Sequence, residues 1–216
     1  GAPPPLGFAG DAIAVIYIAA AGAVLLMLTA FASRSPYASV GGSREMMLLL
    51  SVEPTMAVAL VIAAVKAGTL TVGGMLAWHA EHGPAISMAI AAIGFLIAIQ
   101  AQAGRLPFDI PEAEQELMGG PLVEQSGPRL ALLRWALWAK QLVLALLLVE
   151  VFVPWPRTAW FVVNLPLALL KAMAVLALVA VIDVVTPRLR VEQAMTFYLR
   201  VAFACVAGLA FALIGM

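Results

Sequence analysis

Five acidic residues gather in one polar stretch of an otherwise apolar chain, a predicted loop over residues 105–132. They are Asp109, Glu112, Glu114, Glu116 and Glu124. On a helix, three of them (Asp109, Glu112 and Glu116) would fall within about 60° of one another. Carboxylates held that close repel, so at least one keeps its proton to a higher pH. The pattern predicts a cluster that exchanges protons near neutral pH.

A plainer interpretation of the same stretch stays open. Asp109 could cap a helix whose first turn holds Pro111 and Glu112, a capping-box arrangement. Acidic residues in a first turn also interact favourably with the helix dipole. In that case the loop is a solvated acidic face with no role in proton handling.

A second set of ionisable residues lies within stretches that are otherwise apolar. They are Glu53, Lys140, Glu150, Lys171, Asp183 and Arg200. Each costs roughly 2.5–3.5 kcal/mol at the centre of a membrane helix, so such side chains face a wet interior or pair with each other. A series of them across a bilayer predicts a proton or sodium relay. Two or three buried structural ion pairs are the alternative.

Other chemistries find little support in the sequence. The single cysteine, Cys205, cannot alone make a disulfide, an iron–sulfur cluster or a cysteine zinc site. His79 and His82 have a spacing that could suggest zinc, but no third ligand is in view. We expect them to be solvated histidines in an exposed loop. We therefore expect no metal and no cofactor to be bound by this chain itself.

The composition indicates where these residues work. The chain is 64% hydrophobic and 11% charged, with a mean hydropathy of +1.04, whereas soluble domains are about half apolar and a quarter charged. The net charge is zero, so the basic surface that nucleic-acid binding needs is not indicated. We predict an all-α integral membrane protein with a single transmembrane domain over residues 1–216.

Six segments are long and apolar enough to span a bilayer, which takes roughly 20 residues. They cover about 11–32, 45–66, 84–104, 133–153, 161–183 and 193–215. The residues on one side of these spans carry seven arginines, whereas the other side has only Lys66 and Arg157. The positive-inside rule then predicts that the acidic loop faces the cytoplasm and both ends face outward. In a bacterial-type cell this is the inner membrane.

Three stretches resemble one family of membrane subunits. Arg105-Leu-Pro-Phe-Asp-Ile-Pro-Glu-Ala-Glu-Gln-Glu-Leu117, with Gly120 and Glu124-Gln-Ser-Gly127 after it, is similar to a signature of the membrane "heel" subunit of respiratory complex I. The matching subunit of formate hydrogenlyase and other energy-converting membrane-bound nickel–iron hydrogenases shares it. Arg44–Glu53 and Pro187–Met195 resemble two further family segments. The family has eight spanning helices, so the resemblance implies its last six, with the first two lacking.

The resemblance also implies roles and partners. The acidic loop would pack under a hydrophilic small subunit that carries an iron–sulfur cluster, beside a hydrogenase-like large subunit with a nickel–iron site and antiporter-like membrane subunits. Glu53 and the loop glutamates would line or gate the ion route. The residues implied at the cytoplasmic interface are Arg105, Arg188, Arg190 and Glu192. Gln102 and Leu137 replace acids of complex I, and Trp135…Lys140-Gln141 is closer to the hydrogenase branch.

We therefore expect a membrane-anchor and ion-pathway subunit of a membrane-bound nickel–iron hydrogenase-type complex. It would couple electron transfer in a hydrophilic arm to proton or sodium translocation, with no redox centre on this chain. Within the same class, the alternative is the quinone-site subunit of NADH:quinone oxidoreductase. Outside it, the alternatives are a free-standing ion antiporter, which would show inverted repeats, and a purely structural membrane anchor.

Overall fold

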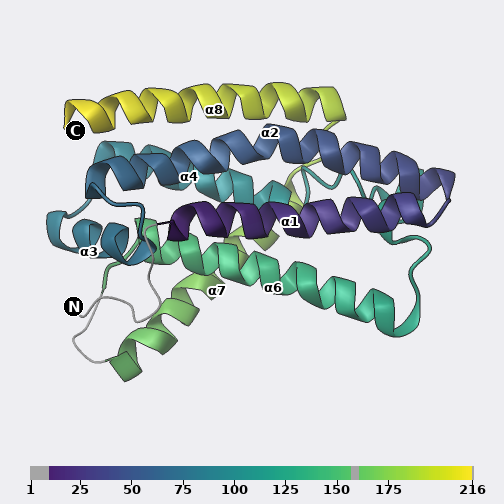
Figure 1. Ribbon diagram of the computed structural model, residues 1–216, viewed down its shortest axis with the longest axis horizontal. Coiled ribbons are helices and arrows are strands. Elements are labelled where there is room, and N and C mark those ends of the chain that lie inside the picture. Colours follow the sequence, from purple (N-terminus) through teal and green to yellow (C-terminus); the bar gives the residue numbers. More distant parts are fainter. Residues whose placement is uncertain (1–9, 157–160, 216) are drawn as a thin grey trace.

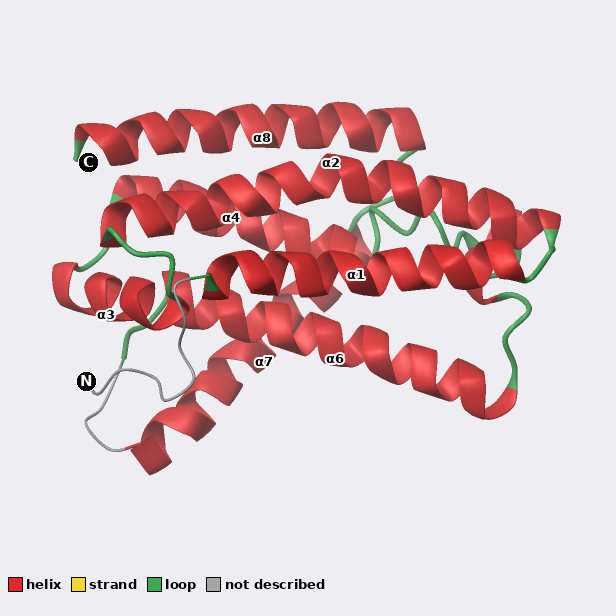
Figure 2. Ribbon diagram, viewed as in Figure 1, coloured by secondary structure: helices red, strands yellow, loops and turns green. Residues whose placement is uncertain are grey.

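The computed structural model describes residues 10–156 and 161–215, apart from the side chains at 114, 115, 161 and 162. Every regular element in these ranges is helical, as Figure 2 shows. Helices satisfy their own backbone hydrogen bonds, which is required where lipid offers no partners. The prediction of an all-α multi-pass membrane protein is confirmed.

Five helices are long and apolar enough to cross a membrane. They are α1 (Asp11–Ala32), α2 (Pro36–Ala67), α6 (Gly127–Phe152), α7 (Phe161–Val185) and α8 (Val191–Ile214). A sixth apolar helix, α4 (Ile86–Gln102), has 17 residues, or about 25 Å of rise, at the short limit for a span. These six helices correspond to the six predicted spans.

The helices share one long axis, except that α7 diverges from the others (Figure 1). The start of α1 and the end of α8 lie at the same end of the bundle as the short helix α3 (Val72–His82). The loop over residues 103–126 lies at the opposite end, with the short helix α5 (Glu114–Leu117) and the 3₁₀ helix η1 (Gly120–Leu122). We call these the α3 end and the loop end.

Several elements differ from the predicted ones; α6, for example, begins at Gly127, before the predicted start at 133. The span predicted over 45–66 begins at Pro36, since proline suits a first helical turn, where its missing N–H has no partner to lose. The supposed outer loop contains α3, whose N-cap Thr71 accepts a hydrogen bond from Gly74 N at 3.2 Å. The expectation of two solvated histidines is wrong for His79, which is 1% exposed. It is met by His82, which is exposed.

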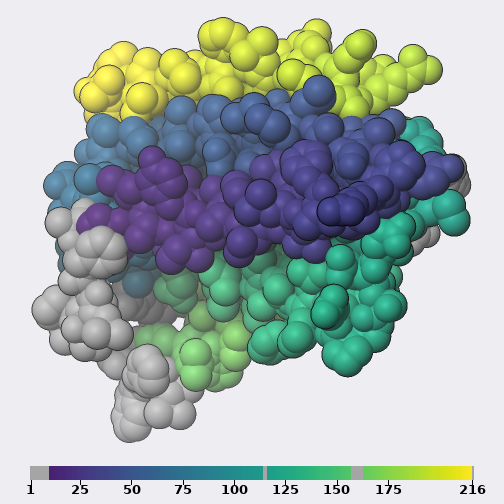
Figure 3. All heavy atoms as spheres, turned by 45° about the vertical axis from the view of Figure 1, so that its right-hand side comes forward, coloured from purple at the N-terminus to yellow at the C-terminus, as the bar shows by residue number. Residues whose placement is uncertain are grey.

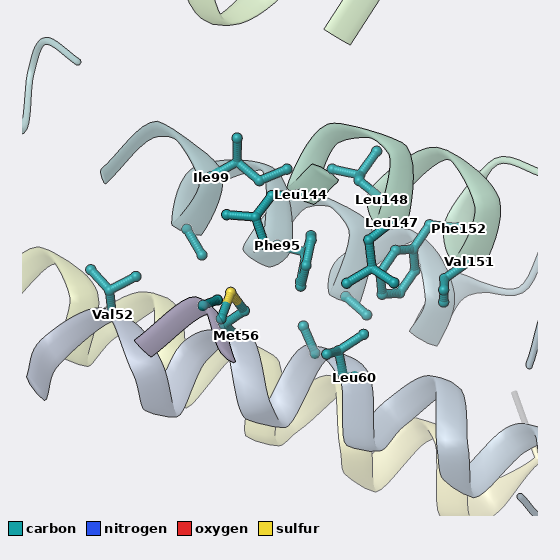
Figure 4. Packing of buried hydrophobic residues seen from close by; sticks show 14 of the residues in the cluster. Val52, Met56, Leu60, Phe95, Ile99, Leu144, Leu147, Leu148, Val151 and Phe152 are labelled. Atoms are coloured by element: carbon teal, nitrogen blue, oxygen red, sulfur yellow. The ribbon is translucent and has the colours of Figure 1, made fainter. Parts of the chain in front are cut away.

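The core forms around α2, which packs against α1, α4 and α8. Figure 4 shows Met56 and Leu60 of α2 facing Phe95 of α4 and Leu147 of α6. Small residues let the helices approach closely, as is usual in membranes. A Cβ added to Gly208 of α8 would meet a side-chain atom of α4 at 3.0 Å.

The outer surfaces stay apolar. Figure 3 shows α8 along the upper edge of the view, with its outer side uncovered. Leu199 and Phe203 on this helix are 59% and 67% exposed. Such a surface fits lipid or partner helices better than water.

Candidate functional site

The loop over residues 103–126 is fixed to the bundle by main-chain contacts. Leu106 N donates to Asp183 Oδ1 at 2.7 Å, and Leu189 N donates to Pro107 O at 2.9 Å. Both partners belong to α7 or the segment after it. On the other side, Gly41 of α2 lies so close to η1 that an added Cβ would be 2.7 Å from Pro121 Cδ. The acidic stretch is therefore a packed layer at the loop end.

Glu116 connects this layer to two other segments through two ion pairs. Its Oε2 lies 2.8 Å from Arg44 Nη1 on α2 and 3.0 Å from Arg188 Nη2 before α8. The hydrogen bonds from Arg44 and Arg188 keep the pKa of this carboxyl below its usual range. Half of the side chain is exposed, so the pairs add little to stability. Glu116 therefore connects three segments, namely the loop, α2 and the residues before α8.

The prediction of three carboxylates on one helical face is wrong. The helix α5 begins only at Glu114, so Asp109 and Glu112 lie before it in irregular backbone. The same boundary rules out the capping box built on Asp109. Short turns and two prolines shape the stretch instead. The side chain of Glu114 lies outside the described part of the structure.

Glu112 is the loop carboxylate with a perturbed environment. It is partly buried and lines a cavity of about 250 Å³ together with Arg105, Arg134 and Gln141. Burial raises its pKa to about 7, reinforced by the charges of Asp109 and Glu45 and opposed by those of the two arginines. At neutral pH this carboxyl is near the midpoint of its titration, so small changes in local potential move its proton.

Glu45 links the loop to the membrane interior. It lies at the loop end of α2, within electrostatic range of Glu112 on one side and Lys140 of α6 on the other. Lys140 in turn interacts with Glu53, further along α2. Four charges therefore follow one another from loop to interior. We call Glu112, Glu45, Lys140 and Glu53 the charged series.

Sequence reasoning missed Glu45 as a site residue. It stands at the first position of the predicted span, where a charged residue looks like an ordinary helix flank. Its separation of eight residues from Glu53 was a usable signal, since on a helix this spacing places two side chains about 80° apart. The true extent of α2, from Pro36, puts both well inside one helix.

Lys140 also borders an apolar cavity. This cavity, of about 420 Å³, runs between α1 and α6 and is lined by side chains such as Ile18 and Val143. Among its described lining residues Lys140 carries the sole charge. The alkyl stem passes Gly22 of α1, whose added Cβ would lie 4.0 Å from Lys140 Cδ. The ammonium group can thus reach carboxylates on α2 while its stem remains in apolar surroundings.

Glu150 and Lys171 form a separate polar site at the α3 end. Lys171 Nζ donates to Val153 O and Pro154 O, both at 3.1 Å, at the carboxyl end of α6. It also interacts with Glu150, and both line a cavity of about 270 Å³. Helix carboxyl ends carry partial negative charge, which suits an ammonium group.

An apolar segment separates this site from the charged series. Lys140 and Glu150 are ten residues apart on α6, or about 15 Å along its axis. Between them, Leu144, Leu147 and Leu148 are buried in the core (Figure 4). The predicted relay residues therefore do not form one continuous row across the bundle. The structure places them in two groups, one toward the loop end and one at the α3 end.

The remaining predicted site residues lie at the loop end. Asp183 accepts from Leu106 N and lies 3.9 Å from Arg105, so it serves the anchoring of the loop. Glu124 is exposed beside a surface hollow of about 920 Å³. Arg190 and Glu192 are exposed at the start of α8. Within the described ranges, no group of three or more His, Cys, Asp or Glu side chains could hold a metal ion.

Comparisons with known proteins agree with this architecture. A family model described as NADH dehydrogenase matches residues 4–214. Hydrogenase-4 component C of Escherichia coli (strain K12) is 36% identical over 187 residues, 83% of this chain and 59% of that protein. Formate hydrogenlyase subunit 4 of the same organism is 32% identical over 195 residues, 87% of this chain and 64% of that protein. The chain thus spans about six tenths of the length of these curated relatives.

A solved structure shares the fold. In the membrane-bound sulfane sulfur reductase, an archaeal respiratory membrane complex, one chain superposes with a TM-score of 0.74 at 23% identity. The match covers 92% of this chain and 78% of that one. The family match extends over nearly all of the helices, the loop and the charged series. The chain therefore belongs to the family described as NADH dehydrogenase, and it is similar to membrane subunits of hydrogenase-4 and formate hydrogenlyase.

Proposed function

We propose that this chain is the membrane-anchor and ion-pathway subunit of a membrane-bound nickel–iron hydrogenase-type complex. It would couple electron transfer in a hydrophilic arm to translocation of protons, or of sodium ions. The similarity to hydrogenase-4 component C and formate hydrogenlyase subunit 4 supports the class of complex. The observation that carries the coupling role is the charged series, which begins at a carboxyl with a pKa of about 7.

The proposed mechanism is electrostatic. An electron arriving near the loop end lowers the local energy of a proton on Glu112, whose pKa rises further. One pKa unit corresponds to about 1.4 kcal/mol. Once Glu112 is neutral, its repulsion of Glu45 is removed, and the balance between Glu45 and Lys140 changes. The change reaches Glu53, the last member of the series.

The apolar segment of α6 determines where the ion leaves. Because Leu144, Leu147 and Leu148 separate Lys140 from Glu150, a straight route across this chain would pass through dry core. We infer that the series delivers its charge sideways, to antiporter-like membrane subunits next to Lys140 and Glu53. Glu150 and Lys171 would act at the opposite membrane surface.

The arginine residues at the loop end indicate how the protein would be oriented and where its partners would bind. The arginine-rich loop end would face the cytoplasm of the inner membrane, with the α3 end outward. Arg105, Arg188, Arg190 and Glu192 would meet the cluster-bearing small subunit. The iron–sulfur clusters and the nickel–iron site would belong to that subunit and to the hydrogenase-like large subunit, and this chain would supply no redox centre.

A second candidate is the quinone-site subunit of NADH:quinone oxidoreductase. The cavity of about 250 Å³ beside Arg105 and Glu112 favours it, since a partly open space with polar groups could receive a quinone head group. Quinone-dependent turnover, and quinone density in this cavity, would distinguish this candidate from a subunit of a hydrogenase-type complex.

The set of co-purifying subunits tests the proposal. The full-length protein would be tagged and extracted from its native membrane in mild detergent, and its partners would be identified together with their metal content. We expect a nickel-containing large subunit and an iron–sulfur small subunit. A flavin-containing, quinone-reducing assembly without nickel would favour the second candidate. Purification without any redox partner would reject both, in favour of an antiporter or a structural anchor.

A further inference from the structure

A small, partly open space lies between α2 and α4, beside the charged series. It is lined by Glu45, Gln102 and four apolar or small residues, namely Leu48, Leu49, Val52 and Ala101. Its volume is about 10 Å³, which is about the minimum that one water molecule needs. The space is too small for a lipid, a quinone or a hydrated ion.

The amide of Gln102 leaves a donor unused at this place. Its Nε2 is buried and has no hydrogen-bond partner among the described residues. Buried donors without a partner are rare because their lost hydration is costly. Glu45, on the opposite wall, is partly buried and offers carboxylate oxygens that accept hydrogen bonds.

We propose that one ordered water molecule occupies this space and joins Gln102 to Glu45. The water oxygen accepts from Gln102 Nε2–H, and one water O–H donates to the Glu45 carboxylate. This orientation is fixed by the chemistry, since an amide nitrogen only donates and an ionised carboxylate only accepts. Gln102 is then a positioning residue, which holds the water without exchanging protons itself.

The water would serve the charged series by exchanging protons with Glu45. This part of the inference rests on the proposed function. Glu45 must lose and regain a proton as the charge on Glu112 changes. A water already hydrogen-bonded to its carboxylate provides a proton donor and acceptor at that position, without opening the apolar contact between α2 and α4.

Density maps of the intact complex test the site directly. At a resolution that shows ordered water, we expect a single peak within hydrogen-bond distance of both Gln102 Nε2 and the Glu45 carboxylate. An empty space, or a direct hydrogen bond between the two side chains that closes it, would overturn the proposal.

The variant Gln102→Leu tests the role of the water in the same complex. Leucine has a similar volume but no amide, so the water loses its donor. Loss of one hydrogen bond in a chain that ends on a carboxylate should slow proton translocation roughly tenfold. The infrared O–H band that shifts in water labelled with heavy oxygen should disappear. If no water is bound, the same variant instead relieves a buried unpartnered donor, raises thermal stability and leaves translocation unchanged.

Thr55→Val is the matched control. Thr55 Oγ1 is also buried without a partner among the described residues, on the same helix α2, but it does not line this space. We expect unchanged translocation and an unchanged water band. Equal slowing in both variants would assign the effect to helix packing and reject the water. If Glu112→Gln left translocation intact while the water peak was present, the proposed function would fail and the water site would remain.

Discussion

Replacing Glu112 with glutamine should reduce proton translocation on the order of 100-fold, the usual effect of removing a positioned proton-transfer group. The substitution keeps the shape of the side chain and its place beside Arg105 and Arg134, but it removes the titratable group whose pKa is about 7. Translocation into sealed vesicles would be measured together with turnover of the redox arm. Uncoupled or arrested turnover is expected.

Glu124→Gln is the control for this experiment. Glu124 belongs to the same acidic loop but is exposed beside an open surface hollow. Its replacement should leave coupling near the wild-type value. If Glu112→Gln pumps as well as Glu124→Gln, the loop has no role in coupling and is a solvated acidic layer.

Replacing Lys140 with methionine should both destabilise the protein and abolish coupling. Methionine keeps the length of the stem beside Gly22 but leaves Glu45 and Glu53 without their shared cation. Lys140 acts on the two carboxylates through longer-range attraction and makes no direct ion pair with them in the described residues, so we expect a loss of about 1 kcal/mol. The free energy of unfolding in detergent would be measured alongside translocation.

The double variant Glu45→Gln/Lys140→Met distinguishes an interacting pair from two separate residues. Neutralising Glu45 as well removes one of the two uncompensated charges, so part of the lost stability should return. For charges that attract each other without a direct ion pair, we expect an interaction energy of about 0.5 kcal/mol in such a cycle, at the low end of the usual range. Strictly additive losses would mean that the two charges do not interact. Coupling should stay lost in the double variant, because the series remains interrupted.

The fold was largely predictable because membrane helices are long, apolar and bounded by strong breakers. The missed helix, α3, shows the limit of that approach. Its Gly73-Gly74 pair suggests a turn, yet the segment folds because Met75 and His79 are buried against neighbouring helices, and His79 Nδ1 donates to Val151 O. Tertiary burial overrode local propensity, and the one local signal for a helix here was its N-cap residue, Thr71.

The candidate site was predicted in part. Glu112 was expected to exchange protons, and its environment supports that expectation. Burial is the largest cause of its raised pKa; of the two expected neighbours, Asp109 contributes and Glu116 does not, and Glu45 adds a charge that was not expected. Glu116 connects segments through ion pairs, whereas Glu112 titrates near neutral pH, and this difference depends on which arginines lie near each carboxylate. Those arginines come from distant segments, so spacing along the chain could not show it.

Lys171 and Asp183 illustrate the same limit. Both were predicted as members of one relay through the membrane. In the structure, Asp183 anchors Leu106 and Lys171 is held by carbonyls at the end of α6. A charge within an apolar stretch indicates that something must compensate it, but the partner is set by the packing of other helices.

The protonation of Glu112 is most directly measured by infrared spectroscopy of the intact complex across a pH titration. A carboxyl with a raised pKa keeps its proton below about pH 7 and loses it above. We predict a protonated-carboxyl band that fades with a midpoint near pH 7, is absent in Glu112→Gln and persists in Glu116→Gln. A carboxylate at position 112 that is already ionised throughout the range from about pH 5 to pH 8, in which physiological titration takes place, would contradict the proposed role of Glu112.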